Sequence, residues 1–95
     1  MDGVEGLQGA DYQVKLSPQA QRELNRLRGN TYARLESAID ELARNPRPRG
    51  CRKMVSLVNE WRIRVGAYRI IYAIDDTVRQ VLIHRVGHRR DVYGS

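Results

Sequence analysis

The sequence contains a single cysteine, Cys51, and no apolar run that approaches the length of a membrane span. One cysteine excludes an internal disulfide framework and is typical of a chain kept in a reducing compartment. The first residues include Asp2 and Glu5 and lack the basic and apolar segments of a secretory signal. We therefore predict a cytoplasmic protein with no membrane partner.

Several motifs that carry catalysis or hold cofactors are also absent. The chain has no phosphate-binding P-loop, no G-x-S-x-G nucleophile turn and no H-E-x-x-H metal-binding pair. A zinc site needs three or four protein ligands. One cysteine and two histidines, His84 and His88, are a poor supply, although their spacing on a regular strand would place both on one side. We predict no metal and no cofactor.

Positive charge is concentrated in one half of the chain. The net charge is +6. Residues 1–46 hold six Lys/Arg and seven Asp/Glu, whereas residues 47–95 hold eleven Lys/Arg and four Asp/Glu, a net of +7. Such concentration predicts a polyanionic partner. Nucleic acid is the first candidate, ahead of an acidic protein or an anionic membrane surface.

The N-terminal segment predicts a leader followed by one strand. Residues 1–10 hold three glycines and few bulky side chains, so we expect a flexible leader ahead of a single domain at residues 11–95. Residues 11–16 alternate apolar and polar side chains, which predicts a short strand.

Two amphipathic helices are predicted to follow this strand. Ser17 stands before a proline, and this pair favours a helix start because the hydroxyl caps free N–H groups. Gly29 is expected to break this helix, and Asn30 or Thr31 to cap the next one. Asn45, which precedes a proline, should end it. The short link predicts an antiparallel helical hairpin.

Alternating residues in the second half predict a sheet. The stretch from Trp61 to Val86 alternates apolar and polar side chains between turn residues, which is typical of a three-strand antiparallel meander. The predicted strands cover residues 53–58, 61–65, 68–74 and 78–86. The predicted fold class is α+β, with the element order β-α-α-β-β-β-β and an antiparallel sheet packed against the hairpin.

Arginines gather on the predicted sheet. Arg62 and Arg64 lie on one side of a strand, and Arg69 lies among apolar neighbours in the next strand, where a cation needs a partner. More basic residues lie in the loop before the sheet, in the last strand and after it. We predict RNA contacts for Arg47, Arg49, Arg52, Lys53, Arg85 and Arg90.

The motifs W-R-I-R-V-G-x-Y-R-I-I-Y and V-L-I-H-R-V-G-H-R-R-D-V-Y resemble the RelE/ParE superfamily of bacterial toxin–antitoxin toxins. The resemblance covers most of the chain and includes the S-P-x-A helix start and the helix pair that ends in N-P. It implies a small α+β domain and a cognate antitoxin as partner. RelE-like members cut messenger RNA on the ribosome, whereas ParE-like members inhibit DNA gyrase and are not nucleases.

The resemblance also implies which residues carry catalysis. By motif position these are Arg62, Arg64, Arg69, Arg89 and Tyr93. The resemblance implies lysine at the first two of these positions in RelE itself, where this chain has arginine. Arginine stays protonated and serves poorly as a general base. Proton transfer then needs another group, for which His88 and Tyr93 are candidates and Glu60 a weaker one.

We predict a RelE-like, ribosome-dependent mRNA endonuclease. In this chemistry the RNA 2′-hydroxyl attacks the neighbouring phosphate without a metal, and guanidinium groups stabilise the added negative charge. Two alternatives stay open. One is a ParE-like gyrase inhibitor, which the arginine-for-lysine replacements favour, and the other is a basic nucleic-acid-binding module without chemistry.

Overall fold

The computed structural model describes residues 11–55, 59–88 and 90 of the chain. The elements follow the predicted order, which confirms the α+β fold class. They are β2 (Gln13–Leu16), α1 (Pro18–Asn25), α2 (Gly29–Arg44), β3 (Arg52–Lys53), β4 (Glu60–Val65), β5 (Tyr68–Asp75) and β6 (Gln80–His88). The expected leader at residues 1–10 lies outside the described residues. No helix in the described part is long and apolar enough to span a membrane.

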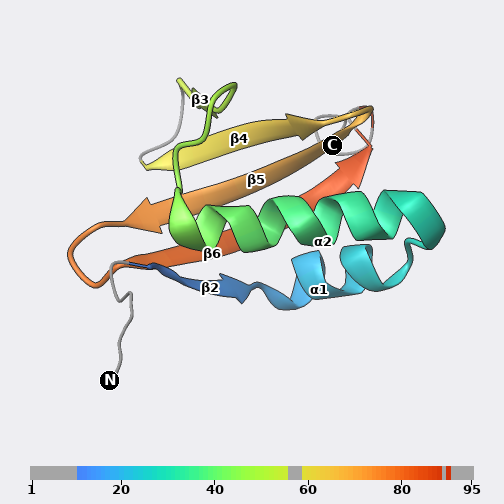
Figure 1. The fold of residues 1–95 in the computed structure, drawn as a ribbon, viewed down its shortest axis with the longest axis horizontal. Coiled ribbons are helices and arrows are strands. Elements are labelled where there is room, and N and C mark those ends of the chain that lie inside the picture. Colours follow the sequence, from blue (N-terminus) through green and yellow to red (C-terminus); the bar gives the residue numbers. More distant parts are fainter. Residues whose placement is uncertain (1–10, 56–58, 89, 91–95) are drawn as a thin grey trace.

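The five strands form one mixed sheet in the order β2-β6-β5-β4-β3 (Figure 1). The meander strands and β3 pair antiparallel as predicted, but β2 runs parallel to β6, where an antiparallel sheet was expected. Alternation in a sequence indicates a strand but not its direction. The direction of β2 is fixed at Ser17, whose N–H donates to Ile83 O at 2.8 Å and whose hydroxyl donates to His84 O at 3.0 Å.

Helix α1 continues along the edge of the sheet where β2 ends (Figure 1). Its predicted cap is confirmed, because Ala20 N–H donates to Ser17 Oγ at 3.0 Å. The Glu23 carboxylate accepts from Val86 N–H at 2.8 Å and from Arg85 Nε at 2.9 Å. Strand β2 pairs with β6 only as far as Ile83, so the N–H of Val86 lies at an uncovered edge of the sheet. By bonding this N–H, Glu23 protects the edge from pairing with another chain.

Helix α2 begins earlier than the sequence predicted. Arg28 is its N-cap and makes no side-chain cap hydrogen bond, so the expected caps, Asn30 and Thr31, lie inside the first turn. Gly29 has φ +59°, which glycine adopts without strain. The glycine expected to break a helix is therefore the first residue of one. The predicted end at Asn45 is confirmed.

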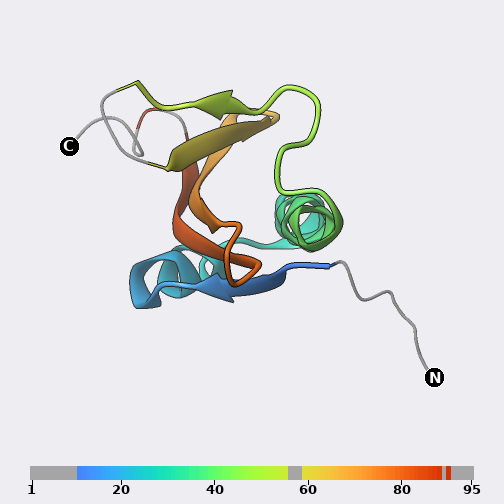
Figure 2. The same cartoon turned by 90° about the vertical axis from the view of Figure 1, so that its left-hand side faces the viewer.

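The core lies between the helices and one face of the sheet (Figure 2). The sheet residues of this core are Ile70, Tyr72 and Ile74 of β5 and Val81, Ile83 and Val86 of β6. In β6 the buried positions change from odd to even numbers between Ile83 and Val86. A β-bulge accounts for this change, because Ile71 pairs with Arg85 while the adjacent Tyr72 pairs with Ile83, which leaves His84 as the extra residue.

Two strands have other bounds than predicted. The expected strand at residues 53–58 is shortened to β3, because Met54 N–H donates to Glu60 O at 2.8 Å and Val55 then lies in a turn, fully exposed. Residues 56–58 lie outside the described residues. Strand β6 begins two residues late because the turn continues to Arg79, which has φ +55°. A short edge strand such as β3 offers little template for aggregation.

Candidate anion-binding site

A hollow of about 310 Å³ opens where β3, β4 and β5 meet the loop before β3. It lies over the sheet face that carries Arg69, opposite the buried face of Ile70 and Tyr72. We call it the arginine hollow, and its lining residues are Arg49, Gly50, Arg52, Arg62, Ile63, Arg64 and Arg69. Five of these seven carry a guanidinium group, and no described Asp or Glu is among them. The hollow is therefore suited to a polyanion.

The register of the sheet brings these arginines together. Arg52 pairs directly with Arg62 across β3 and β4, and Arg64 pairs directly with Arg69 across β4 and β5. Like charges directly opposite each other destabilise a sheet. The two pairs bring four guanidinium groups together on one face of three neighbouring strands, an arrangement that an anion could bridge.

Arg69 is the most buried of the lining arginines, with 6% of its surface exposed. Within the described part of the chain its guanidinium makes one hydrogen bond, from Nη1 to Tyr68 O at 3.3 Å. A guanidinium carries five N–H donors, so most of its donor capacity is unused there. Burying a charge without full compensation is costly. A phosphate group can accept two parallel charge-assisted hydrogen bonds from such a side chain.

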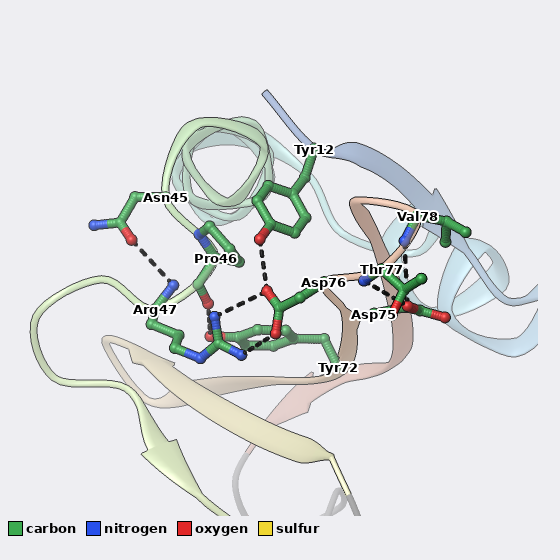
Figure 3. A network of polar contacts seen from close by, with 9 residues as sticks. All are labelled: Tyr12, Asn45, Pro46, Arg47, Tyr72, Asp75, Asp76, Thr77 and Val78. Carbon is green, nitrogen blue, oxygen red and sulfur yellow. Dashed lines mark hydrogen bonds and ion pairs between the residues drawn. The ribbon is translucent and has the colours of Figure 1, made fainter. Parts of the chain in front are cut away.

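A polar network next to the hollow fixes the start of the loop that carries Arg49 (Figure 3). Arg47 holds Asp76 with two hydrogen bonds, Nη1 to Oδ1 at 3.2 Å and Nη2 to Oδ2 at 2.8 Å. The Tyr12 hydroxyl donates to Asp76 Oδ1 at 2.6 Å. The buried Tyr72 hydroxyl donates to Pro46 O at 2.7 Å. We call this network the loop clamp, since it ties the loop to the turn between β5 and β6.

The loop clamp explains the position of Arg47 and the ionisation of its partners. The Arg47 guanidinium also lies 5.1 Å from the centre of the Trp61 ring, within reach of a cation–π interaction. Hydrogen bonds from Arg47 and then from Tyr12 lower the pKa of Asp76 to about 2. Burial raises the pKa of Tyr72. Arg47, predicted to contact RNA, therefore lies outside the arginine hollow and bonds a carboxylate of its own chain.

The remaining residues predicted to contact RNA are scattered. The hollow includes Arg49 and Arg52, and Lys53 is exposed beside them on β3. Arg85 is bonded to Glu23 at the other edge of the sheet, at 2.9 Å. Arg90 is exposed. Arg49, Arg52 and Lys53 of the predicted set thus lie in or beside the hollow. Arg47 and Arg85 are instead bonded to carboxylates of this chain.

His88 lies on the opposite face of the sheet from Arg69. It pairs in register with Tyr68, and the two rings meet edge-on at 5.6 Å, whereas the partner of Arg69 is Gly87. Its Nδ1 accepts from Arg90 N–H at 3.3 Å. The structure therefore does not bring His88 into the arginine hollow. The other two C-terminal candidates, Arg89 and Tyr93, lie outside the described residues.

An acid–histidine pair lies on the same face as the arginines, and alternation in the sequence did not predict it. His84 Nε2 lies 2.9 Å from Glu60 Oε2, with side chains 35% and 17% exposed. Glu60 was expected in a turn, but it is the first residue of β4 and points to the same side as Arg62 two residues later. The two histidines, expected on one side, lie on opposite faces because of the bulge. Alternation extended back from Arg62 could have placed Glu60.

Among the described residues, no group of three or more His, Cys, Asp or Glu side chains could hold a metal ion. The single cysteine, Cys51, is a partly buried free thiol.

Comparisons with known proteins show the family of the chain. Residues 14–93 match the family described as "ParE toxin of type II toxin-antitoxin system, parDE". Toxin RelG of Mycobacterium tuberculosis is 36% identical over 83 residues, which cover 86% of this chain and 95% of that protein.

Solved structures show the same likeness. The RelBE2 toxin–antitoxin complex from Mycobacterium tuberculosis has a TM-score of 0.73 at 32% identity and covers 83% of this chain and 99% of that one. The RelE–RelB complex from Pyrococcus horikoshii OT3 has a TM-score of 0.74 at 27% identity, with 83% and 96% covered. The isolated RelE toxin of E. coli has a TM-score of 0.71 at 22% identity, a likeness of fold.

Proposed function

The chain belongs to the RelE/ParE family of type II toxin–antitoxin toxins, and we propose that it is a RelE-like endonuclease that cuts messenger RNA on the ribosome. The observation that carries the proposal is the arginine hollow. It places two directly opposed arginine pairs and the buried Arg69 around one space of about 310 Å³. Such a gathering of guanidinium groups is suited to an anionic ligand, and RNA supplies a phosphate at each nucleotide.

The proposed chemistry is attack of the RNA 2′-hydroxyl on the adjacent phosphate. The transition state carries extra negative charge on the phosphate oxygens, and guanidinium groups fixed by the sheet stabilise it without rearranging. Arg62, Arg64 and Arg69 are proposed for this role on their positions in the hollow. Arg89 and Tyr93 remain proposed on motif position.

The proposed partners are a cognate antitoxin, the ribosome and mRNA. Two of the similar structures are toxin–antitoxin complexes, RelBE2 and RelE–RelB. An antitoxin that silences this toxin by covering the hollow would carry acidic side chains there, because guanidinium groups pair with carboxylates. We propose a cytoplasmic site of action, where mRNA and ribosomes are present.

Inhibition of DNA gyrase is the alternative function. The matching family is described by its ParE toxins. The positions of Arg62 and Arg64 also hold side chains of fixed charge, which suit binding better than proton transfer. In that case the hollow would bind an acidic surface of a protein target.

Two assays run side by side test the proposal against its alternative. The first is primer extension on mRNA in translating ribosomes after addition of the purified toxin, and the second is DNA supercoiling by gyrase. We expect new 5′ ends within the mRNA and unchanged supercoiling. Inhibited supercoiling together with intact mRNA would replace the nuclease proposal with the gyrase inhibitor.

A further inference from the structure

The arginine hollow supplies charge but no group that exchanges a proton near neutral pH. Arginine stays protonated throughout the physiological range. Cleavage by the 2′-hydroxyl needs an acceptor for the proton of that hydroxyl. His88, one sequence-based candidate, lies on the other face of the sheet with Tyr68. Within residues 11–55, 59–88 and 90, an acceptor for this proton is therefore sought elsewhere on the face that carries Arg69.

We infer that His84, held by Glu60, accepts the proton of the RNA 2′-hydroxyl. The inference rests on the proposed nuclease function and adds a residue to that site. His84 is the one described histidine on the face of the hollow, because the bulge in β6 turns it there. Its side chain is 35% exposed, which leaves it accessible to a substrate.

The pair lies beside the hollow. Glu60 is two residues from Arg62 on β4, which places their Cα atoms about 6.6 Å apart along one face. Ile71 of β5 lies between Arg62 and Arg85 in one row, and Ala73 lies between Glu60 and Leu82 in the next. The small side chain of Ala73 leaves room for the pair to meet across β5. A phosphate held by Arg62 therefore brings its neighbouring ribose toward the pair.

The hydrogen bond to Glu60 defines which imidazole nitrogen of His84 can accept the proton. Nε2–H donates to Glu60 Oε2 at 2.9 Å, so Nδ1 keeps the lone pair in the neutral ring. The carboxylate also stabilises the imidazolium that forms, as a third group does for a catalytic base in general. Glu60 is thus a positioning residue, and His84 is the group assigned to proton transfer.

In the proposed step, the 2′-oxygen replaces the 5′-oxygen on phosphorus. The 2′-oxygen forms a bond to phosphorus while its proton moves to His84 Nδ1, and the bond from phosphorus to the 5′-oxygen breaks. The products are a 2′,3′-cyclic phosphate and a 5′-hydroxyl end. The leaving oxygen takes a proton from water, and the hydroxide so formed is neutralised by the proton that the imidazolium releases.

Among the described residues, the charged groups around His84 come from three elements. They are Glu60 and Arg62 on β4, Arg85 on β6 and Glu23 on α1. Strand β5 contributes only the uncharged Ile71 and Ala73 between them. Arg85 is already bonded to Glu23 at 2.9 Å, which leaves Glu60 as the carboxylate bonded to His84.

Single-turnover cleavage of mRNA on purified ribosomes tests the inference, with wild type, His84→Gln, His88→Gln and Arg22→Gln compared over a range of pH. His84→Gln should slow cleavage by about two to four orders of magnitude and remove the fall in rate at acid pH, since a protonated base cannot accept a proton. Arg22→Gln changes an exposed α1 residue and should cleave at the parental rate. Circular dichroism checks the fold.

Chemical rescue separates proton transfer from a structural role. Imidazole added to His84→Ala should restore part of the cleavage rate, and it should not restore Arg69→Ala. Parental cleavage by His84→Gln, loss of the acid limb in His88→Gln instead, or a slow His84→Ala that imidazole does not rescue would each overturn the inference and leave the nuclease proposal standing. Wild type that does not cleave would overturn both.

Discussion

Arg69 is costly for the fold, and we propose that it is retained for the site. It is 6% exposed in the most apolar strand, directly opposite another arginine. Sequence alone predicted that a cation among apolar neighbours needs a partner, and the structure supplies only Tyr68 O within the described residues. Residues that lower stability at a site are commonly retained for function.

Arg64→Gln should stabilise the free toxin. The change removes one charge from the opposed pair with Arg69, and such cross-strand contacts contribute roughly 0.2–1 kcal/mol. Chemical denaturation at low salt should show a rise of that size in the free energy of unfolding, and the rise should shrink at high salt. RNA binding should weaken in the same variant. A variant less stable than wild type at low salt would show that repulsion between Arg64 and Arg69 does not destabilise the free toxin.

Placement of single residues was predictable where alternation is unbroken. Arg62, Arg64 and Arg69 lie on one face as expected. The prediction fails for the histidines because one extra residue in β6 reverses which side each later residue faces. Such a bulge depends on pairing with β5 and leaves no mark in local composition. The roles of Arg89 and Tyr93 remain predictions.

At the scale of elements, the loop clamp connects the core to the hollow. Tyr72 is fully buried in β5, and its hydroxyl holds Pro46 O at 2.7 Å. One residue further along, Arg47 is bonded to Asp76 in the turn between β5 and β6. Arg49 follows two residues later and lines the hollow. The clamp therefore sets where a loop arginine lies in the hollow.

Asp76→Asn should loosen this loop and remove a pH dependence. The native pKa of Asp76 is about 2, below the unfolded value of about 3.9. Its contribution to stability is therefore full above about pH 4 and is lost as pH falls towards about 2. Denaturation at pH 6 and pH 3 should show a smaller acid loss in Asp76→Asn than in wild type. The exposed Asp11→Asn serves as control, and equal acid losses in all three proteins would contradict the prediction.

The elements themselves were largely predictable, and their ends less so. The Ser17 cap and the stop at Asn45 follow from local chemistry and are confirmed. The start of α2 was missed because Gly29 takes a positive φ inside the helix instead of ending the one before it. The parallel pairing of β2 depends on contacts with β6 some 67 residues later in the chain. Period-two alternation carries no such information.

At the scale of the whole molecule, the two halves of the sequence differ in net charge and contribute different parts of the fold. Residues 47–95 have a net charge of +7, and they supply every lining residue of the arginine hollow. The nearly neutral first half supplies α2, which lies against the other face of the sheet, and α1, which continues along the sheet edge next to β6 (Figure 2). The asymmetry seen in composition is therefore an asymmetry between the faces of one sheet.

RNA binding should weaken steeply with salt. Each phosphate contact releases counterions, and for single-stranded RNA the slope of log affinity against log salt is roughly −0.7 per contact. If all five arginines of the hollow contact phosphates, the slope should be about −3.5. Filter binding measures this slope with an RNA oligonucleotide that carries a 2′-deoxy nucleotide at the cleavage position, so that it cannot be cut. Affinity that stays constant from low to physiological salt would indicate an apolar protein target instead.

The central claim is that the arginine hollow is where mRNA is bound and cut. The most direct test is single-turnover cleavage of ribosome-bound mRNA by wild type, Arg69→Ala and the charge-matched control Arg22→Gln, with growth arrest on induction measured beside it. We predict cleavage and arrest for wild type and control. Arg69→Ala should remain folded by circular dichroism yet lose at least about two orders of magnitude in rate, the usual effect of removing one group that stabilises transition-state charge. A folded Arg69→Ala protein that cleaves mRNA and arrests growth as wild type does would contradict the account.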